Sequence, residues 1–391
     1  MFVFCCPALL RAQDGVTNFR PMRKRALAVT AAVVGLAVAL GWSPGHRYWR
    51  AGKMLSALSS AHAAGAPESE PLVEEDLTVD GAGGKFRARV YRVRGQTSGR
   101  GLIVAHGIHH EGMNERRMVP FARELARSGL VVLTPEMTDL ADYRITHQGV
   151  NVIRDAAVYL RGRRDIVADA PVGLLGFSFA GGLSLVAAAE PELAGRVSYV
   201  VSVGGHHDLE RVLRFLIRNQ VETPAGVVPM AAHDYGLVVL LYGAVDRFAP
   251  EADRAALRDA LRASLHQDHA AAVTAAARLT TDRGRQLWQL ADTRRLQTLA
   301  PELEAVVDAQ RAELAALSPR GRLAAIHAPV YLVHGSGDSV IPPSEAQWAS
   351  AELGSADHIT LITPLMEHVE VNKPAGIGDR LALLRFIAQM L

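Results

Sequence analysis

The chain of 391 residues is 49% hydrophobic and carries 42 Lys and Arg against 40 Asp and Glu, a formal net charge of +2 at pH 7. This length and apolar content suffice for a large buried core, which excludes a largely disordered protein. The balanced charge gives no basic field, so nucleic acid is not a predicted partner. Both cysteines, Cys5 and Cys6, precede any expected globular part, which therefore has no disulfide or thiol chemistry.

Residues 1–53 are predicted to be an N-terminal tail with a signal anchor or signal sequence. An uncharged apolar run, residues 26–42, follows a basic cluster and is short for a membrane span but slightly long for a signal-peptide core. Aromatic and basic residues just after the run favour an uncleaved anchor, and the excess of basic residues before it predicts an exported globular domain. Ala37-Val-Ala39 also fits a cleavage site, which would give a secreted protein, and either Met1 or Met22 could be the start.

A linker and a hairpin are predicted next. Residues 54–71 are rich in Ala, Ser, Gly and Pro, a composition typical of linkers. Residues 74–79 and 85–93 alternate apolar and polar side chains around the glycine-rich stretch 80–84, which predicts a β-hairpin. The globular domain is therefore expected to begin near Leu72.

Buried strands and helices then alternate along the chain. Strands are predicted at residues 101–107, 130–135, 172–175 and 197–203, and helices near residues 116–128, near 150–163 and from 183 onward. This alternation predicts a doubly wound, mostly parallel sheet in an α/β fold. Ligands of such sheets bind beyond the carboxyl ends of the strands.

Ser178 stands on the turn between a predicted strand and a predicted helix. A turn this tight exposes the serine hydroxyl at the strand's carboxyl end, beside a helix N-terminus whose free N–H groups stabilise negative charge. Gly176 and Ala180 are small enough for such a turn, and Gly182 continues the run of small residues. The pattern predicts a nucleophile, although a packing turn with an idle serine also fits the pentapeptide. A dinucleotide-binding unit is disfavoured because no G-x-G-x-x-G is present.

Serine catalysis needs an oxyanion hole, a base and an acid that orients the base. The strand at residues 101–107 ends in His106-Gly107, so the backbone N–H groups of Ile108 and Phe179 are predicted to converge on one oxygen. Two histidine clusters are alternative metal ligands: His106 with His109 and His110, and His206 with His207 and Asp208. Adjacent loop histidines more often serve as turn and surface residues, so no metal is predicted.

The alternation stops between residues 209 and 325. This region is rich in Arg, Ala and Leu with helical periodicity, for example at residues 251–265 and 299–317. It is predicted to be a helical cap inserted into a core formed by residues 72–208 and 326–391. Whether the cap is a mobile lid or only packs the rim stays open.

The alternation resumes with a strand that ends in a glycine turn and Asp338. A last short strand at residues 358–363 is followed by His368. Ser178, Asp338 and His368 are thus each predicted at a strand's carboxyl end, in the order nucleophile, acid and base. Asp208, at the end of the preceding strand, is the alternative acid.

These pieces resemble the α/β-hydrolases from about Leu72 to Leu391, apart from the cap. The resemblance rests on His106-Gly107, Gly176-Phe-Ser-Phe-Ala180, Gly335-Ser-Gly-Asp338 and His368. Further stretches, Arg116-Arg117 and residues 121–126 and 204–213, are similar to bacterial proteins labelled dienelactone-hydrolase-like. Dienelactone hydrolases proper use a cysteine nucleophile and lack a large cap, whereas this chain has Ser178, and Ala180 replaces the usual glycine.

The residues and the resemblance together predict a carboxylic-ester hydrolase. His368 would take the proton of Ser178, Asp338 would orient the imidazole, and water would release the acyl-enzyme. A serine peptidase or amidase, a cofactor-free haloperoxidase or lyase, and an anchored non-catalytic binding protein are the alternatives. The expected partners are a small acyl or ester substrate and, through the N-terminal helix, a membrane, and no cofactor is predicted.

Overall fold

The structure is a computed structural model of the chain, and it describes residues 45, 48–49, 51–52, 71–371 and 376–390. The predicted anchor at residues 26–42, and the predicted linker except for Pro71, lie outside these residues. The chain divides into two units, Met1–Trp49 and Arg50–Leu391, and the second contains every strand of the sheets. None of the helices in the described ranges has the length and apolar character needed to cross a membrane.

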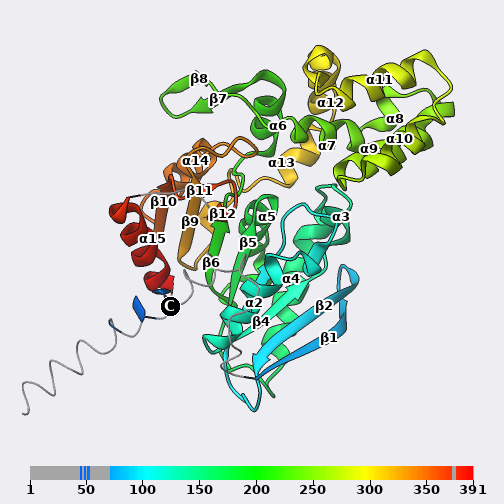
Figure 1. Cartoon of the computed structure of the whole chain (residues 1–391). Coiled ribbons are helices and arrows are strands. Elements are labelled where there is room, and N and C mark those ends of the chain that lie inside the picture. The colour runs from blue at the N-terminus through cyan, green and yellow to red at the C-terminus, as the bar shows by residue number, and fades with distance from the viewer. Residues whose placement is uncertain (1–44, 46–47, 50, 53–70, 372–375, 391) are drawn as a thin grey trace, which may run out of the picture. The chain divides into compact units, whose positions relative to one another are not determined.

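An eight-stranded sheet forms the centre of the second unit (Figure 1). Its strands are β1 (Leu72–Gly81), β2 (Gly84–Val93), β3 (Arg100–Ala105), β4 (Leu130–Pro135), β5 (Val172–Phe177), β6 (Val197–Val203), β9 (Val330–Gly335) and β10 (His358–Thr363). They lie in the order β1-β2-β4-β3-β5-β6-β9-β10, and β2 runs antiparallel to all the other strands. The predicted mostly parallel sheet is confirmed, and this strand order fits the α/β-hydrolase fold.

Helices cover both faces of the sheet. The helices of this part are α2 (Met118–Arg127), α3 (Thr138–Ala141), α4 (His147–Gly162), α5 (Phe179–Ala188), α14 (Ser344–Leu353) and α15 (Ile377–Met390). Side chains of α4 and α5 join one apolar core, and those of α2 and α15 join the other. Successive residues of β3 alternate between the two cores, Leu102 and Val104 in one and Ile103 and Ala105 in the other. The sheet is therefore buried on both sides, as its continuous apolar strands require.

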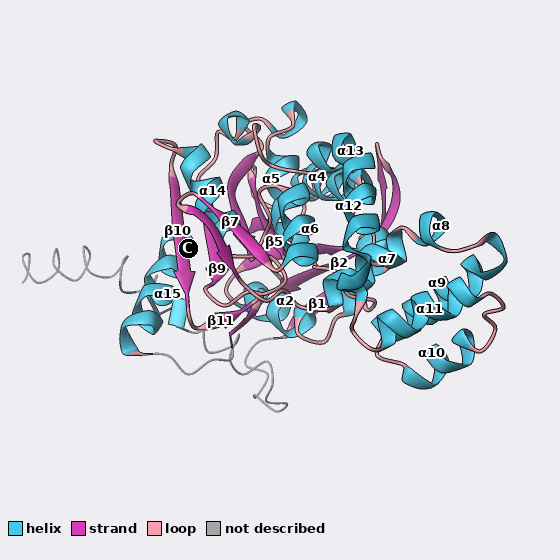
Figure 2. Cartoon of the chain, turned by 90° about the horizontal axis from the view of Figure 1, so that it is seen from above, coloured by secondary structure: helices cyan, strands magenta, loops and turns pink. Residues whose placement is uncertain are grey.

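The insertion between β6 and β9 is mainly helical. Its helices are α6 (Leu209–Arg218), α7 (Tyr235–Gly243), α8 (Val245–Phe248), α9 (Glu251–Leu265), α10 (His269–Ala276), α11 (Asp282–Asp292), α12 (Ala300–Ala309) and α13 (Arg311–Ala316). Figure 2 shows α9, α10 and α11 grouped beside one another. The division into core and cap domains stays a prediction, because residues 50–391 form one compact unit.

Two details of the insertion differ from the sequence expectation. An antiparallel hairpin, β7 (Gln220–Thr223) and β8 (Gly226–Pro229), interrupts the helices. Asn219 ends α6 in the left-handed conformation (φ 55°), which turns the chain into this hairpin. The single helical stretch expected at residues 299–317 is two helices, separated at Gln310.

Asp253 fastens α9 to the start of α11. Its side chain is fully buried, and Oδ1 accepts the backbone N–H (2.7 Å) and hydroxyl (2.8 Å) of Thr280. Oδ2 accepts the backbone N–H (2.9 Å) and hydroxyl of Thr281. A side chain at Gly284 would collide with this carboxylate, so the glycine allows the close approach.

Replacing Asp253 by alanine is expected to lower the free energy of unfolding by about 2–4 kcal/mol, because buried donors lose their acceptors. Denaturant unfolding of the purified protein measures the change. Asp259→Ala is the matched control on the same helix, since its carboxylate is exposed and pairs with an exposed arginine, Arg278. Equal losses for the two variants would contradict this role of Asp253.

Candidate active site

The turn that carries Ser178 is strained in the way a nucleophile turn requires. Ser178 has φ 54° and ψ −132° between β5 and α5, a backbone conformation that residues other than glycine rarely adopt. A side chain at Gly176 would collide with the carbonyl oxygen of Ala180 and with Oγ of Ser184. The N–H of Ser178 donates to the carbonyl of Val203 at 2.8 Å, which holds the turn against the end of β6.

Gly176→Ala is expected to destabilise this turn, because the new methyl group meets a backbone carbonyl that cannot move aside. Overpacking of this kind costs about 1–3 kcal/mol. The midpoint temperature of thermal unfolding should fall, and the matched control is Gly162→Ala in α4, where a side chain would meet nothing within 4 Å. A wild-type midpoint in Gly176→Ala would show that the glycine is not needed.

Gly182 lets α5 approach the loop that follows β6. A side chain there would collide with the imidazole of His206, which is 1% exposed. Nε2 of His206 donates to the carbonyl of Leu317 at 3.0 Å, and burial lowers the pKa of this ring. His206 is therefore a neutral packing residue between the elbow helix and the end of the insertion.

His368 and Asp338 are in direct contact. Nδ1 of His368 lies 2.7 Å from Oδ2 of Asp338, so the Nδ1–H group donates to the carboxylate. Nε2 is then left without a proton in the neutral ring and can act as a base. His368 has φ 51° and sits on the turn between β11 (Met366–Glu367) and β12 (Glu370–Val371). Strained backbone at such a position is frequent in functional sites.

Asp338 is fully buried and receives hydrogen bonds on both oxygens. Oδ1 accepts the N–H groups of Val340 (2.9 Å) and Ile341 (3.0 Å). Nε2 of His334, which donates to the carbonyl of Ile341 at 2.8 Å, lies 3.3 Å from Oδ2. Burial raises the pKa of Asp338, but the attraction of His368 and hydrogen bonds from both histidines outweigh it and hold the pKa well below its usual range. The carboxylate is thus ionised at neutral pH.

Ser178 and the His368–Asp338 pair both lie beside the end of β6. A Cβ placed on Gly204 would lie 3.5 Å from Oδ2 of Asp338 and 3.5 Å from the carbonyl oxygen of His368. Gly204 follows Val203, whose carbonyl binds the N–H of Ser178. Within the described ranges no hydrogen bond joins the hydroxyl of Ser178 to His368. Such bonds are often long in ligand-free enzymes and tighten with substrate.

His106 orients the peptide group that carries the N–H of Ile108. Its Nε2 accepts the N–H of Met137 at 3.0 Å, so its proton is on Nδ1, which donates to the carbonyl of Gly107 at 2.8 Å. Burial lowers the pKa of His106, and the ring is neutral. Because the C=O and N–H groups of a trans peptide point in opposite directions, the N–H of Ile108 points away from His106.

The two predicted oxyanion donors are both available. A Cβ placed on Gly107 would lie 3.2 Å from Cβ of Ser178, so the loop of Ile108 passes beside the nucleophile. Phe179 is the first residue of α5, where helix N–H groups have no partner within the helix. Among the residues that the structure describes, no acceptor binds the N–H of Ile108 or of Phe179.

Asp208, the alternative acid, belongs to a different network. Its Oδ1 accepts the N–H of Arg211 and caps α6, and its Oδ2 accepts a hydrogen bond from Arg320 at 2.7 Å. The neighbouring His207 donates to Glu352 at 2.7 Å. Burial raises the pKa of Asp208, but the bonds from Arg320 and Arg211 outweigh it and lower the pKa. The acid that the structure brings to His368 is Asp338.

One histidine at this site was not predicted from the sequence. His334 is 1% exposed at the end of β9 and lies beside the carboxylate of Asp338. Its signal in the sequence is a polar residue in an otherwise apolar strand, four positions before the acid.

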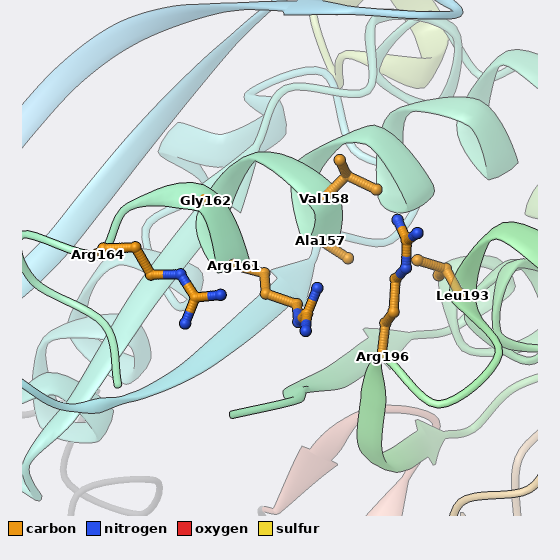
Figure 3. A pocket seen from close by; sticks show the side chains of 7 residues that line it. All are labelled: Ala157, Val158, Arg161, Gly162, Arg164, Leu193 and Arg196. Atoms are coloured by element: carbon orange, nitrogen blue, oxygen red, sulfur yellow. The ribbon is translucent and has the colours of Figure 1, made fainter. Parts of the chain in front are cut away.

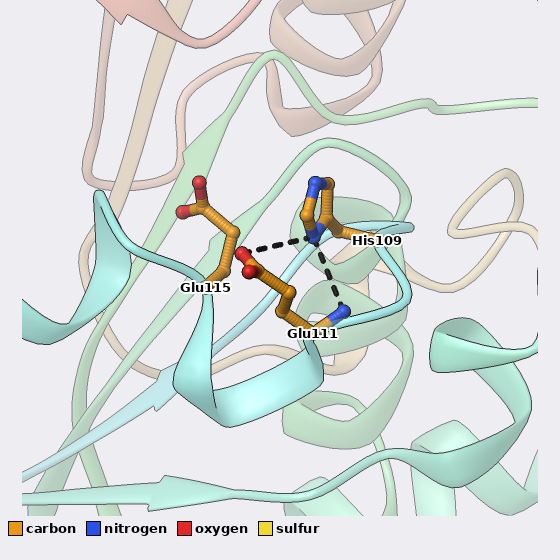
Figure 4. Close-up of side chains that lie close together, drawn as sticks. All are labelled: His109, Glu111 and Glu115. Carbon is orange, nitrogen blue, oxygen red and sulfur yellow. Dashed lines mark hydrogen bonds and ion pairs between the residues drawn. The ribbon is translucent and has the colours of Figure 1, made fainter. Parts of the chain in front are cut away.

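A group of possible metal ligands, His109, Glu111 and Glu115, lies on the loop after β3 (Figure 4). Nδ1 of His109 is 3.8 Å from the Glu111 carboxylate and accepts the Glu111 N–H. The Glu115 carboxylate already pairs with the Arg117 guanidinium at 2.7 Å and accepts the N–H of Met118 at 3.0 Å. The guanidinium of Arg117 and the backbone at the start of α2 thus already occupy the Glu115 carboxylate.

A hollow of about 120 Å³ lies at the end of the sheet opposite to Ser178 (Figure 3). Its lining includes Val158 and Arg161 of α4, with Arg164 and Arg196 from the loops that follow. Arg196 directly precedes β6, so the hollow is at the amino ends of the strands, whereas Ser178 is at their carboxyl ends. It contains none of the predicted site residues.

No family model and no curated protein matches the chain. Among solved structures, an esterase of Pyrobaculum calidifontis is 18% identical, with 89% of this chain and 92% of that chain covered and a TM-score of 0.44. The rice cell wall degrading esterase LipA of Xanthomonas oryzae, solved as a mutant, is 14% identical over 85% and 92%, with a TM-score of 0.49. An acylaminoacyl peptidase of Pyrococcus horikoshii is 11% identical over 83% and 40%, with a TM-score of 0.42.

The order of the eight strands, the single antiparallel β2 and the strand-to-helix turn at Ser178 are features of the chain itself. They give it the α/β-hydrolase fold.

Proposed function

We propose that the protein is a serine hydrolase that cleaves carboxylic esters through an acyl-enzyme on Ser178. The observation that carries the proposal is the 2.7 Å hydrogen bond between His368 and the fully buried Asp338, beside the strained turn of Ser178. An ionised acid that fixes the Nδ1–H tautomer leaves Nε2 to serve as the general base.

The reaction follows the usual two halves of acyl transfer. Nε2 of His368 takes the proton of Ser178 while Oγ attacks the ester carbonyl, and the N–H groups of Ile108 and Phe179 stabilise the oxyanion. The protonated imidazole then gives its proton to the leaving alkoxide, and the acyl-enzyme forms. Water, deprotonated by His368, attacks the acyl-enzyme, the bond between the acyl carbon and Oγ breaks, the carboxylic acid leaves, and the imidazolium returns its proton to Oγ of Ser178. Asp338 stays ionised throughout and stabilises the imidazolium.

A panel of p-nitrophenyl esters from acetate to dodecanoate tests the proposal. We expect turnover with a burst of nitrophenol if deacylation is slow, and a preference for longer chains if apolar surface of the insertion receives the acyl group. Matched p-nitroanilides test the peptidase or amidase alternative, which predicts comparable rates for amide and ester. A folded protein that hydrolyses neither series would contradict a serine hydrolase.

We also propose that residues 26–42 anchor the protein in a membrane and that the folded domain is exported. The support is in the sequence: an uncharged apolar run follows Arg23-Lys-Arg25 and precedes aromatic and basic residues. Membrane fractionation with carbonate extraction, together with the mass of the N-terminal peptide, tests this. Recovery of the domain in the soluble fraction with its N-terminus after residue 39 would show a cleaved signal sequence instead.

A further inference from the structure

Three histidine rings form a continuous stack between the loop after β3 and the insertion. The rings of His109 and His110 lie 4.5 Å apart at 26°, and those of His110 and His266 lie 4.5 Å apart at 25°. His109 and His110 directly follow Ile108, the predicted oxyanion donor, and His266 directly follows α9. Parallel stacking of planar rings at this separation is attractive. The stack therefore connects the oxyanion loop to a helix of the insertion.

Tyr143 reinforces the same junction. It follows α3, is 3% exposed and has φ 57°, an unusual conformation for an aromatic residue. Its hydroxyl donates to the carbonyl of Leu265, the last residue of α9, at 2.9 Å and lies 3.4 Å from Nδ1 of His110. Its ring is 5.8 Å from that of His266. Burial raises the pKa of Tyr143 to about 12, so the hydroxyl keeps its proton.

A polar cluster fixes the last turns of α9 next to this tyrosine. Oδ1 of Asp142 accepts hydrogen bonds from the hydroxyl of Tyr242 (2.7 Å) and from Nε of Arg262 (3.1 Å). Arg262 also donates to the Tyr242 hydroxyl at 2.9 Å. The end of α9 is thus attached to the core through the side chains of Asp142 and Tyr143.

We infer that His110 and His266 are positioning residues for the oxyanion hole, through which the insertion supports the loop that presents the N–H of Ile108. The inference rests on the proposed function. One side of the Gly107–Ile108 peptide is held by His106, and the stack holds the chain directly after it. The oxyanion hole then requires the insertion in its present position. If the whole insertion moved away as a lid, the loop that carries Ile108 would lose this support.

Burial and neighbouring charges disfavour protonation of His109 and His266. His109 faces Glu111, Glu115 and Arg117, and burial followed by His110 lowers its pKa. Burial and then His110 and Arg262 lower the pKa of His266, and Asp142 opposes them. Because folding disfavours protonation of His109 and His266, their contribution to stability is greatest above the ordinary histidine pKa of about 6.5 and falls as the pH drops below it.

Two substitutions at position 266 separate the effect of ring stacking from the effect of ring protonation. His266→Ala removes the ring, and we expect kcat to fall about tenfold or more with a smaller change in KM, because one misplaced oxyanion donor costs up to 10²–10³-fold. His266→Phe keeps a flat ring, so kcat near pH 7 should return to within about threefold of wild type. Its kcat should also persist to lower pH than that of wild type. His269→Ala, an exposed histidine at the start of α10, is the matched control.

Hydrogen exchange of the peptide that spans residues 106–113 gives a readout that does not depend on activity. Exchange should accelerate in His266→Ala and stay close to wild type in His266→Phe and in His269→Ala. Wild-type protein that is inactive on every ester but shows these differences in exchange would contradict the proposed function. It would still uphold the support of the oxyanion loop by the insertion. If His266→Ala keeps wild-type kcat, pH profile and exchange, or if His266→Phe is as impaired as His266→Ala, the inference is overturned.

Discussion

Ser178→Ala is expected to lower kcat for ester hydrolysis by a factor on the order of 10⁵, because no other hydroxyl occupies the turn between β5 and α5. The loop that carries the oxyanion donor Ile108 passes beside the serine, since a Cβ placed on Gly107 would lie 3.2 Å from Cβ of Ser178. The carbonyl of Val203 accepts the N–H of Ser178. The small residual rate would come from the oxyanion donors and substrate binding alone. Steady-state kinetics on a p-nitrophenyl ester, per mole of folded protein, measure the loss.

Ser184→Ala is the matched control for this experiment. Ser184 is fully buried in the same helix, and its hydroxyl has no hydrogen-bond partner in the described residues. Its removal takes away a buried hydroxyl near the turn and leaves the reacting group in place. We expect near-wild-type kcat, and a loss in Ser184→Ala as large as in Ser178→Ala would mean that the effect is one of packing.

Asp338→Asn is expected to lower kcat by about 10³–10⁴-fold, because an amide at this position no longer selects the Nδ1–H tautomer of His368. The His368 contact at 2.7 Å and the two backbone N–H donors on Oδ1 preserve the position of the side chain, so KM should change less than kcat. Thermal unfolding of the variant shows whether the buried site tolerates the substitution.

Asp208→Asn separates the two candidate acids. It removes the charge that pairs with Arg320 but keeps a side-chain oxygen that can cap α6, so only a small loss of stability is expected, with little loss of kcat in the folded fraction. Active-site titration gives the folded fraction directly. A large drop in kcat for Asp208→Asn together with normal kcat for Asp338→Asn would assign the acid to Asp208.

The sheet and the turn at Ser178 could be predicted because their signals are local. The alternating pattern on either side of residues 80–84 gives the β1–β2 hairpin, and the apolar runs at residues 130–135 and 197–203 give buried strands with those bounds. Gly176 and Ala180 mark the tight turn by their size alone. The serine, acid and histidine could be predicted in this order because each follows a predicted strand.

Three features of the structure were not predicted from the sequence: the His110–His266 contact, the His334–Asp338 contact and the β7–β8 hairpin. His110 meets His266 through folding of the whole insertion, and no spacing in the sequence indicates that two rings so distant will stack. His334 touches Asp338 because the turn after β9 folds back, which the strand pattern alone does not show. The β7–β8 hairpin is short and its Val227 and Val228 are exposed, so hydrophobic periodicity gives only a weak signal for it.

The most direct test of the account is labelling with a fluorophosphonate, followed by peptide mass spectrometry. The reagent forms a bond to a serine only when a base takes its proton and an oxyanion hole receives the phosphoryl oxygen, so labelling reports the assembled site. We expect a single adduct, on Ser178, that is lost in Ser178→Ala and strongly slowed in Asp338→Asn. An adduct on another residue, or Ser178→Ala that labels as strongly as wild type, would contradict the assignment of Ser178 as the nucleophile.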